Sequence, residues 1–204
     1  MNIIDRAKNI IIAPAKEWDI IVAETPDTPK IITGYVLPLA ALAAIAGFIG
    51  YSFIGMDAGF FRMKGFNWGI YQAISVLVGA LLSVFVSAFV IDALAPIFKS
   101  EKNMGRSIQL VAYSFTPAWI GGILSVVPAI AIVGSLFGLY GLYLLYMGFP
   151  KLKKTPEENQ VTYFIVSLLV IIAVYFVIGL IMSRLLMPVM GLSTTIDINN
   201  IRFR

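Results

Sequence analysis

The chain of 204 residues contains neither cysteine nor histidine. Without cysteine it has no disulfide bonds, iron–sulfur clusters or thiol chemistry. Without histidine it lacks the side chain that serves most often as a general base and as a metal ligand. Charged residues are also scarce, at 13% against about 25% in an ordinary soluble domain. Any polar chemistry would therefore depend on a few carboxylates, amines and hydroxyls.

Common enzyme motifs are missing as well. The chain has no HExxH motif and no phosphate-binding GxxxxGK[ST] loop. It has no GxSxG nucleophile elbow either. Because the lysines lie in loops or at the ends of apolar runs, a Ser–Lys pair inside a run is not expected. We therefore predict that the protein is not an enzyme and has no catalytic, cofactor-binding or metal-binding residues.

Long apolar runs are what the chain has in abundance. Hydrophobic residues make up 59% of it, and an apolar run of about 18 or more residues is typical of a transmembrane helix. Five runs have this length: Ile31–Met56, Ile70–Phe98, Ile108–Val127, Ala129–Phe149 and Val161–Val189. The third and fourth are separated only by Pro128, where we predict a hairpin, because one continuous helix would be about twice as long as a bilayer is thick. The predicted fold is an all-α membrane protein with five transmembrane helices.

Positive charges outside the runs predict the orientation. Cytoplasmic loops collect Lys and Arg. Ten such residues fall on the side of the N-terminus: Arg6, Lys8, Lys16, Lys30, Lys99, Lys102, Arg106, Lys151, Lys153 and Lys154. Four fall on the other side, which are Arg62, Lys64, Arg202 and Arg204, and Arg184 lies inside the fifth run. We predict a cytoplasmic N-terminus and an external C-terminus. The net charge of +4 is small, so nucleic acid is not an expected partner.

The first 30 residues have the pattern of amphipathic helices. Ile3, Ile10 and Ile11 recur at helical spacing with polar residues between them. Such helices lie in the membrane interface, and Trp18 is the expected interfacial anchor. The alternative is a short helical segment packed under the spans without lipid contact of its own. We predict three regions: a cytoplasmic segment and connector over 1–30, a membrane domain over 31–189, and an external tail over 190–204.

Polar residues near the cytoplasmic ends of the second and third runs predict a pocket. Asp92 lies about 6–9 Å from the end of the second run, and Tyr113 lies at a similar depth in the third. Because a short loop joins these runs, they are expected to be neighbours. We predict that Asp92, Tyr113 and Ser114 line one pocket, with Arg106 at its mouth and Pro117 just above it. A structural anchor and a site for a ligand or a proton both remain open interpretations of Asp92.

The third and fourth runs carry a family resemblance. Gly105-Arg106-Ser107 leads into a segment that reads Val-Ala-Tyr-Ser-Phe-Thr-Pro and ends at Pro117, and Leu139-Tyr140-Gly141-Leu142-Tyr143 follows the predicted hairpin. This pattern resembles the Yip family of Ypt/Rab-interacting integral membrane proteins in its prokaryotic form. The resemblance extends over about residues 10–185. It implies an integral protein of the cytoplasmic (inner) membrane without known enzymatic chemistry.

The chain also departs from the eukaryotic members of that family. Those members have a long cytosolic N-terminal region and an Asp-Leu-Tyr-Gly-Pro motif before the first span. Here Asp92-Ala93-Leu94-Ala95-Pro96 matches only Asp, Leu and Pro of that motif, and it follows the second run. Binding to Rab GTPases is therefore not expected.

Two function classes remain in view besides an enzyme. The first is a non-enzymatic membrane-organising or adaptor protein that binds membrane lipids, other membrane proteins or a second copy of itself. The second is a small transporter or channel with an inner-leaflet polar pocket around Asp92. A cavity that reaches mid-depth and is lined by Asp92 and Tyr113 would favour transport, whereas a solid bundle would favour the adaptor.

Overall fold

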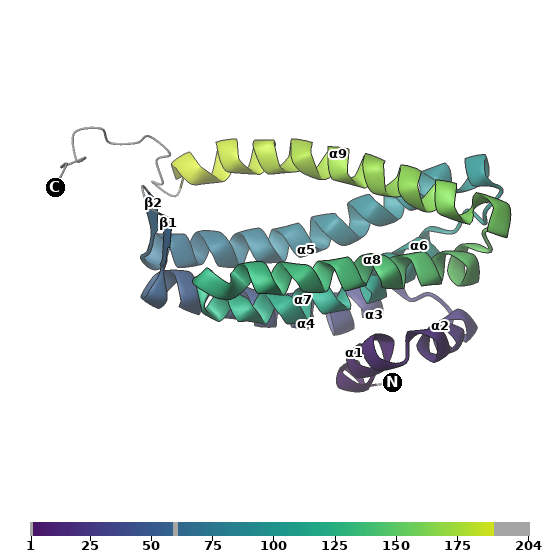
Figure 1. Cartoon of the computed structure of the whole chain (residues 1–204), viewed down its shortest axis with the longest axis horizontal. Helices are drawn as coiled ribbons and strands as arrows, with labels where there is room; N and C mark the ends of the chain where they lie inside the picture. The colour runs from purple at the N-terminus through teal and green to yellow at the C-terminus, as the bar shows by residue number, and fades with distance from the viewer. Residues whose placement is uncertain (1, 59–60, 190–204) are drawn as a thin grey trace.

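Long helices lie side by side in the computed structural model, which describes residues 2–58 and 61–189 (Figure 1). The α-helices are α1 (Ile3–Ile12), α2 (Pro14–Ala23), α3 (Thr28–Ile31), α4 (Leu37–Ile49), α5 (Phe66–Leu94), α6 (Met104–Ser114), α7 (Thr116–Gly122), α8 (Ala131–Lys153) and α9 (Glu157–Val189). Helices α1 and α2 lie beside one end of the bundle. The C-terminal tail predicted over 190–204 lies outside the described residues.

Four helical stretches are long and apolar enough to cross a bilayer. Within the described residues they are Thr28–Ile54, Phe66–Phe98, Pro128–Lys153 and Glu157–Val177. The first contains two π-helical stretches, η1 (Ile32–Val36) and η2 (Gly50–Ile54), and the second ends in the 3₁₀ turn η3 (Ala95–Phe98). The third predicted run, Ile108–Val127, is the one that does not form a continuous helix. It is divided among α6, α7 and the 3₁₀ turn η4 (Ile123–Val126).

Pro117 explains the break between α6 and α7. A proline inside a helix has no N–H for the carbonyl four residues earlier and clashes with it. That carbonyl belongs to Tyr113, and it accepts a hydrogen bond of 2.8 Å from the Thr116 hydroxyl instead. The helix therefore stops at Ser114 and restarts at Thr116 without leaving the Tyr113 carbonyl unpaired.

Two other prolines are accommodated in related ways. Pro38 follows the π-helical turn η1, which shifts the local hydrogen bonds from i−4 to i−5. Pro150 lies inside α8, and the carbonyl that it leaves free, that of Tyr146, accepts a hydrogen bond of 3.2 Å from the Gln160 side chain. Such substitutes matter in a membrane protein, because a bilayer offers no water to free backbone groups.

The predicted hairpin between the third and fourth runs is present. Val127 has an extended backbone, and the 3₁₀ turn η5 (Pro128–Ile130) leads into α8. Helices α7 and α8 then pack closely where Gly121 faces Gly134. The approach is so close that a Cβ atom at either position would collide with the backbone carbonyl of the other glycine. Small residues permit this close approach of helices in lipid.

One short element departs from the all-α prediction. Strand β1 (Met56–Ala58) pairs antiparallel with β2 (Phe61–Met63), with Met56 opposite Met63. Gly55 and Gly65 flank the pair with positive φ angles of 79° and 128°. The rest of the described secondary structure is helical.

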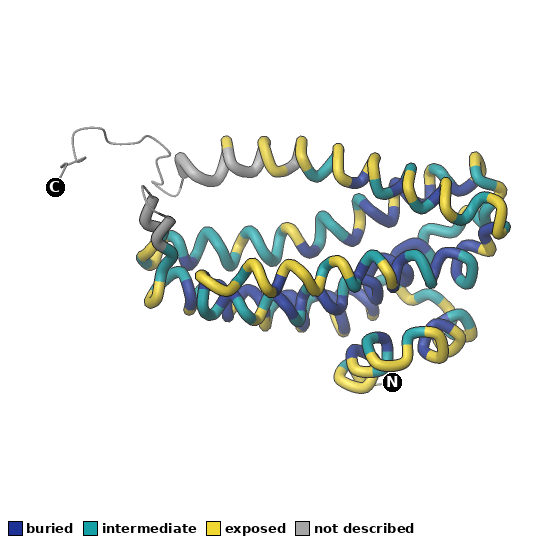
Figure 2. The backbone as a smooth tube through the Cα atoms, in the orientation of Figure 1, coloured by how far each residue is buried: buried dark blue, intermediate teal, exposed yellow. Residues whose placement is uncertain are grey.

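The core is concentrated at the end of the bundle that carries α1 and α2 (Figure 2). Helix α6 buries every residue from Ser107 to Ser114. Helices α5, α8 and α9 are buried on one side and expose large apolar residues elsewhere, including Phe89, Leu136 and Phe176. Such exposed apolar faces suit helices that contact lipid.

Trp18 has a different environment from the one predicted. Its side chain is fully buried, and it packs over Gly148 of α8, where an added Cβ would lie 3.0 Å from the indole atom Cζ2. Lys151 reinforces this contact, because its ammonium binds the Ala15 carbonyl at 2.8 Å and Asp19 at 2.5 Å. The indole is therefore a packing contact between α2 and α8, and the expectation that it lies among lipid headgroups does not hold for this structure.

We predict that Thr116→Val destabilises the protein by about 1–3 kcal/mol, because the buried Tyr113 carbonyl would lose the Thr116 hydroxyl that donates to it. Thr33→Val is the matched control, since the Thr33 hydroxyl donates to the Pro29 carbonyl at an exposed site. Thermal unfolding of the purified protein in detergent measures both variants. Equal melting temperatures for the two variants would contradict the role given to Thr116.

Candidate functional site

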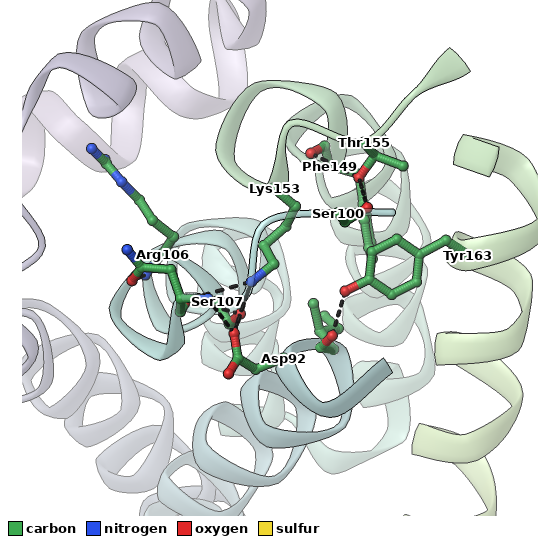
Figure 3. A network of polar contacts seen from close by, with 10 residues as sticks. Asp92, Ser100, Arg106, Ser107, Phe149, Lys153, Thr155 and Tyr163 are labelled. Carbon is green, nitrogen blue, oxygen red and sulfur yellow. Dashed lines mark hydrogen bonds and ion pairs between the residues drawn. The ribbon is translucent and has the colours of Figure 1, made fainter. Parts of the chain in front are cut away.

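Asp92 is at the centre of a network of polar contacts that joins three helices (Figure 3). Its Oδ1 atom accepts hydrogen bonds from the Lys153 ammonium at 2.8 Å, the Ser107 hydroxyl at 3.1 Å and the Asn103 backbone N–H at 2.7 Å. The ammonium also donates to the Ser107 hydroxyl at 2.8 Å. We call Asp92, Asn103, Ser107 and Lys153 the Asp92 cluster. It connects the end of α5, the start of α6 and the end of α8.

Lys153 is the residue of this cluster that the sequence analysis misplaced. It was counted in a basic cytoplasmic loop, yet it is the last residue of α8 and its side chain is 0% exposed. A buried ammonium is costly unless a counter-ion and further acceptors surround it. Asp92 supplies the counter-ion, and Ser107 and the Asn103 carbonyl supply the other acceptors.

The chain around the cluster is held by neighbouring contacts. The Glu101 N–H donates to the Lys153 carbonyl at 2.8 Å. The Lys154 ammonium lies 2.7 Å from the Glu101 carboxylate, and this contact lowers the pKa of Glu101. On the α9 side, the Tyr163 hydroxyl donates to the Ile91 carbonyl while its ring stacks on Phe98. The loop after α5 and the start of α9 are thus fixed around Asp92.

A second network surrounds Arg6 of α1. The guanidinium donates to Glu17 at 2.7 Å and to Glu24, and it lies 5.2 Å from the centre of the Tyr113 ring. Arg6 and Glu17 are both almost fully buried. We call Arg6, Glu17, Glu24 and Tyr113 the Arg6 cluster. It fastens α1 to α2 and places both against α6.

Tyr113 links the Arg6 cluster to the break between α6 and α7. Its ring packs edge-on against Tyr35 at 4.9 Å. The Tyr35 hydroxyl lies 2.7 Å from the Thr116 hydroxyl, which in turn donates to the Tyr113 carbonyl. The Thr116 hydroxyl has a single proton, and it donates that proton to the Tyr113 carbonyl. The Tyr35 hydroxyl is therefore the donor in its pair with Thr116. The first long helical stretch is thereby attached to the proline break.

Arg106 caps the C-terminal end of α2. Its Nη1 atom donates to the carbonyls of Ile21 and Glu24 at 3.2 and 2.9 Å, and to the Gln109 side chain at 3.0 Å. A cation is favourable here because the last carbonyls of a helix carry partial negative charge. Figure 3 shows Arg106 directed away from Asp92.

The residues predicted to form one pocket therefore fall in different places. Asp92 lies in the Asp92 cluster, Tyr113 lies in the Arg6 cluster, and Arg106 binds the end of α2. Ser114 is buried with its carbonyl facing Gly141, and its hydroxyl has no partner among the described residues. Pro117 is buried in the first turn of α7. The sequence correctly predicted that α5 and α6 are neighbours. It did not predict that these side chains are divided between two separate networks.

A polar cavity lies beside the Arg6 cluster rather than beside Asp92. It has a volume of about 840 Å³ and its lining includes Arg6, Glu24, Lys30, Tyr35 and Tyr113. Asp92 is not among its lining residues. The cavity opens beneath the connector between α2 and α3. In the described part of the chain, no three acidic side chains gather closely enough to hold a metal ion.

Arg6 is the residue of this site that sequence reasoning missed. It was counted only as a cytoplasmic charge. The available signal was its position, because Arg6 lies on the same helical face as Ile3 and Ile10. A cation on the apolar face of an amphipathic helix needs a buried partner, and no spacing rule identifies Glu17 and Glu24 in a different helix as that partner.

Comparisons with known proteins give one family match and two similar relatives. The family model described as Yip1 domain matches residues 8–181. The inner membrane protein YohC of Escherichia coli strain K12 is 27% identical over 155 residues, which is 74% of this chain and 80% of the relative. The same protein from Escherichia coli O6:H1 matches equally well. No solved structure matches significantly.

We predict that Asp92→Asn destabilises the protein by about 3–5 kcal/mol, because it leaves the buried Lys153 ammonium without its counter-ion. The double variant Asp92→Asn/Lys153→Met should recover most of this loss, since it removes both charges together. Thermal unfolding in detergent measures the two variants.

The exposed pair of Lys99 and Glu158 provides the matched control. Glu158→Gln should change stability little, because an exposed ion pair contributes about 0–1 kcal/mol. A double variant less stable than Asp92→Asn alone would contradict the proposed dependence of the buried Lys153 ammonium on Asp92.

Proposed function

The chain belongs to the Yip1 domain family, and from this premise we propose that it is a non-enzymatic membrane-organising or adaptor protein. In this role it binds membrane lipids or other membrane proteins. The family match over residues 8–181 and the long apolar helices make it an integral membrane protein of the Yip family.

The proposal rests on helices α1 and α2, which we call the N-terminal platform, because they are attached to the bundle and still carry exposed apolar side chains. Helices α1 and α2 are held to each other by Arg6 and to α8 by Lys151. The Tyr140 hydroxyl adds a bond of 2.7 Å to the Ile11 carbonyl. Yet Ile4 and Ile12 remain 69% and 70% exposed. Large apolar residues on a fixed helix suit contact with acyl chains or with the apolar face of a partner protein.

We further propose that the membrane domain crosses the bilayer five times. The broken segment of α6, α7 and η4 would be the additional crossing. Support comes from its two ends, because Asn103 contacts Asp92 at one end of α5 and Ser125 lies beside Gly47 and Gly50 of the first span. A broken helix is tolerated at membrane depth where the surrounding protein buries it, and Tyr113, Ser114, Thr116 and Pro117 are all buried.

The orientation and location are also proposals. The loop charges favour a cytoplasmic position for α1, α2 and the turn after α8. The E. coli relatives are named inner membrane proteins, which supports a bacterial inner membrane as the location of this chain. The platform would then face the cytoplasmic leaflet.

A transporter remains the alternative, with less support. That function needs Asp92 to reach a cavity. The polar cavity is lined by Tyr113 and not by Asp92, whose carboxylate is enclosed with Lys153. The Asp92 cluster has the geometry of a contact that holds helices together.

We predict that a cysteine at Lys64 is labelled by a membrane-impermeant thiol reagent in intact cells, whereas a cysteine at Lys154 is labelled only after the membrane is permeabilised. Both positions are exposed, and the natural chain has no cysteine to give background labelling. Lys154 is preferable to the buried Lys153. The opposite labelling pattern would overturn the proposed orientation.

We predict that a photo-crosslinking amino acid at Ile12 forms adducts with lipid or with another membrane protein in living cells. Position Ile97 is the matched control, because it is equally exposed at 70% but lies outside the platform. Adducts should be several times more abundant at Ile12. Equal yields at the two positions would contradict a special role of the platform.

A further inference from the structure

Two cavities of different chemistry meet beside α1. The polar cavity of about 840 Å³ lies on one side of Ile3. An apolar groove of about 590 Å³ lies on the other side, between α1 and the helices α4 and α7, with Ile3 in the lining of both. Both volumes fall within the range of about 300–1,000 Å³ that is typical of ligand sites. A ligand that filled both would be polar at one end and apolar at the other.

The polar cavity carries balanced charges of both signs. Its lining includes the cations Arg6 and Lys30 and the anions Glu24 and Asp27. Lys30 forms no ion pair within residues 2–58 and 61–189. Arg6 uses two of its five N–H donors for Glu17 and Glu24. A group with one negative and one positive charge would find partners here.

The anionic side of the cavity also has unused acceptors. Asp27 uses Oδ1 to cap the backbone N–H of Lys30 at 3.1 Å, and Glu24 uses Oε1 for Arg6. The second oxygen of each carboxylate has no hydrogen bond among the described residues. A primary ammonium can donate up to three hydrogen bonds, so two carboxylate oxygens in one cavity suit it.

The groove is suited to a hydrocarbon chain. Its lining includes Ile11, Ile12, Leu42 and Ile120, with Lys8 as the charged residue among the ten that line it. Ile12 and Leu42 are strongly exposed. In a protein embedded in a bilayer, such a groove faces acyl chains, and an apolar chain fits it without unpaired polar groups.

We propose that the polar cavity and the apolar groove together bind one phospholipid whose headgroup carries a phosphate and a primary ammonium. The phosphate binds Lys30 and the remaining donors of Arg6. The ammonium binds Glu24 and Asp27, and one acyl chain passes Ile3 into the groove. The inference deepens the proposed function and rests on it, because it names the lipid that the platform holds.

Native mass spectrometry of the detergent-purified, delipidated full chain tests the proposal. The protein is titrated in separate experiments with phosphatidylethanolamine, phosphatidylglycerol and phosphatidylcholine. We expect one bound phosphatidylethanolamine per chain, with about tenfold weaker binding of the other two, since each lacks the primary ammonium and charge-assisted hydrogen bonds are strong.

Two pairs of variants locate the site. Lys30→Gln should weaken binding about tenfold, whereas Lys16→Gln, at an exposed position on α2 outside both cavities, should leave it unchanged. Leu42→Trp should block the groove, whereas Ile45→Trp, at an exposed position on α4 outside the groove, should not. Asp27→Asn keeps a capping side chain but removes the anion, so it should reduce the preference over phosphatidylcholine even if another variant folds poorly.

Several results would overturn the proposal. Tighter binding of phosphatidylglycerol would assign the cavity to anionic lipid. Equal binding by Leu42→Trp and Ile45→Trp would place the lipid elsewhere on the surface, as would equal binding by Lys30→Gln and Lys16→Gln. The titration involves no partner protein and no membrane orientation, so it can fail while the crosslinking and labelling results stand, and the reverse also holds.

Discussion

The buried ammonium of Lys153 is the constraint on which one whole end of the bundle depends. A charge that is removed from water must be matched by an opposite charge and by further hydrogen bonds. Asp92 and Ser107 can both reach the ammonium only if the end of α5, the start of α6 and the end of α8 lie next to one another. The same arrangement brings Glu101 to the Lys153 carbonyl and sets the start of α9.

The same requirement explains how the prolines are tolerated. Each proline in a helix frees a carbonyl, and a bilayer supplies no donor for it. Thr116 donates to the carbonyl that Pro117 leaves free, and Gln160 donates to the one that Pro150 leaves free. The break at Pro117 therefore separates α6 from α7 without leaving the Tyr113 carbonyl unpaired. It also brings the Tyr113 ring to a position where Arg6 and Tyr35 can contact it.

The N-terminal helices combine two properties that are usually separate. Their inner faces bury Arg6, Glu17 and Trp18, so these helices pack against the bundle. Their outer face keeps Ile4 and Ile12 exposed in the manner of an interfacial helix. The sequence pattern suggested a choice between packing and lipid contact. The buried face shows the packing, and the exposed face is the surface at which we propose lipid contact. The polar cavity exists because the connector after α2 passes over the gap between the Arg6 cluster and α3.

Apolar length and helical spacing in the sequence determined the membrane class, four of the long helical stretches, the turn at Pro128 and the two N-terminal helices. These features follow from local composition, which is why no partner segment was needed to recognise them. The tertiary structure alone decided which charges are paired. Lys153 and Arg6 look like ordinary loop and interface cations, but their partners Asp92 and Glu17 lie 61 and 11 residues away. Only the folded chain brings such groups within hydrogen-bond distance, because burial and pairing depend on the packing of helices and not on spacing along the sequence.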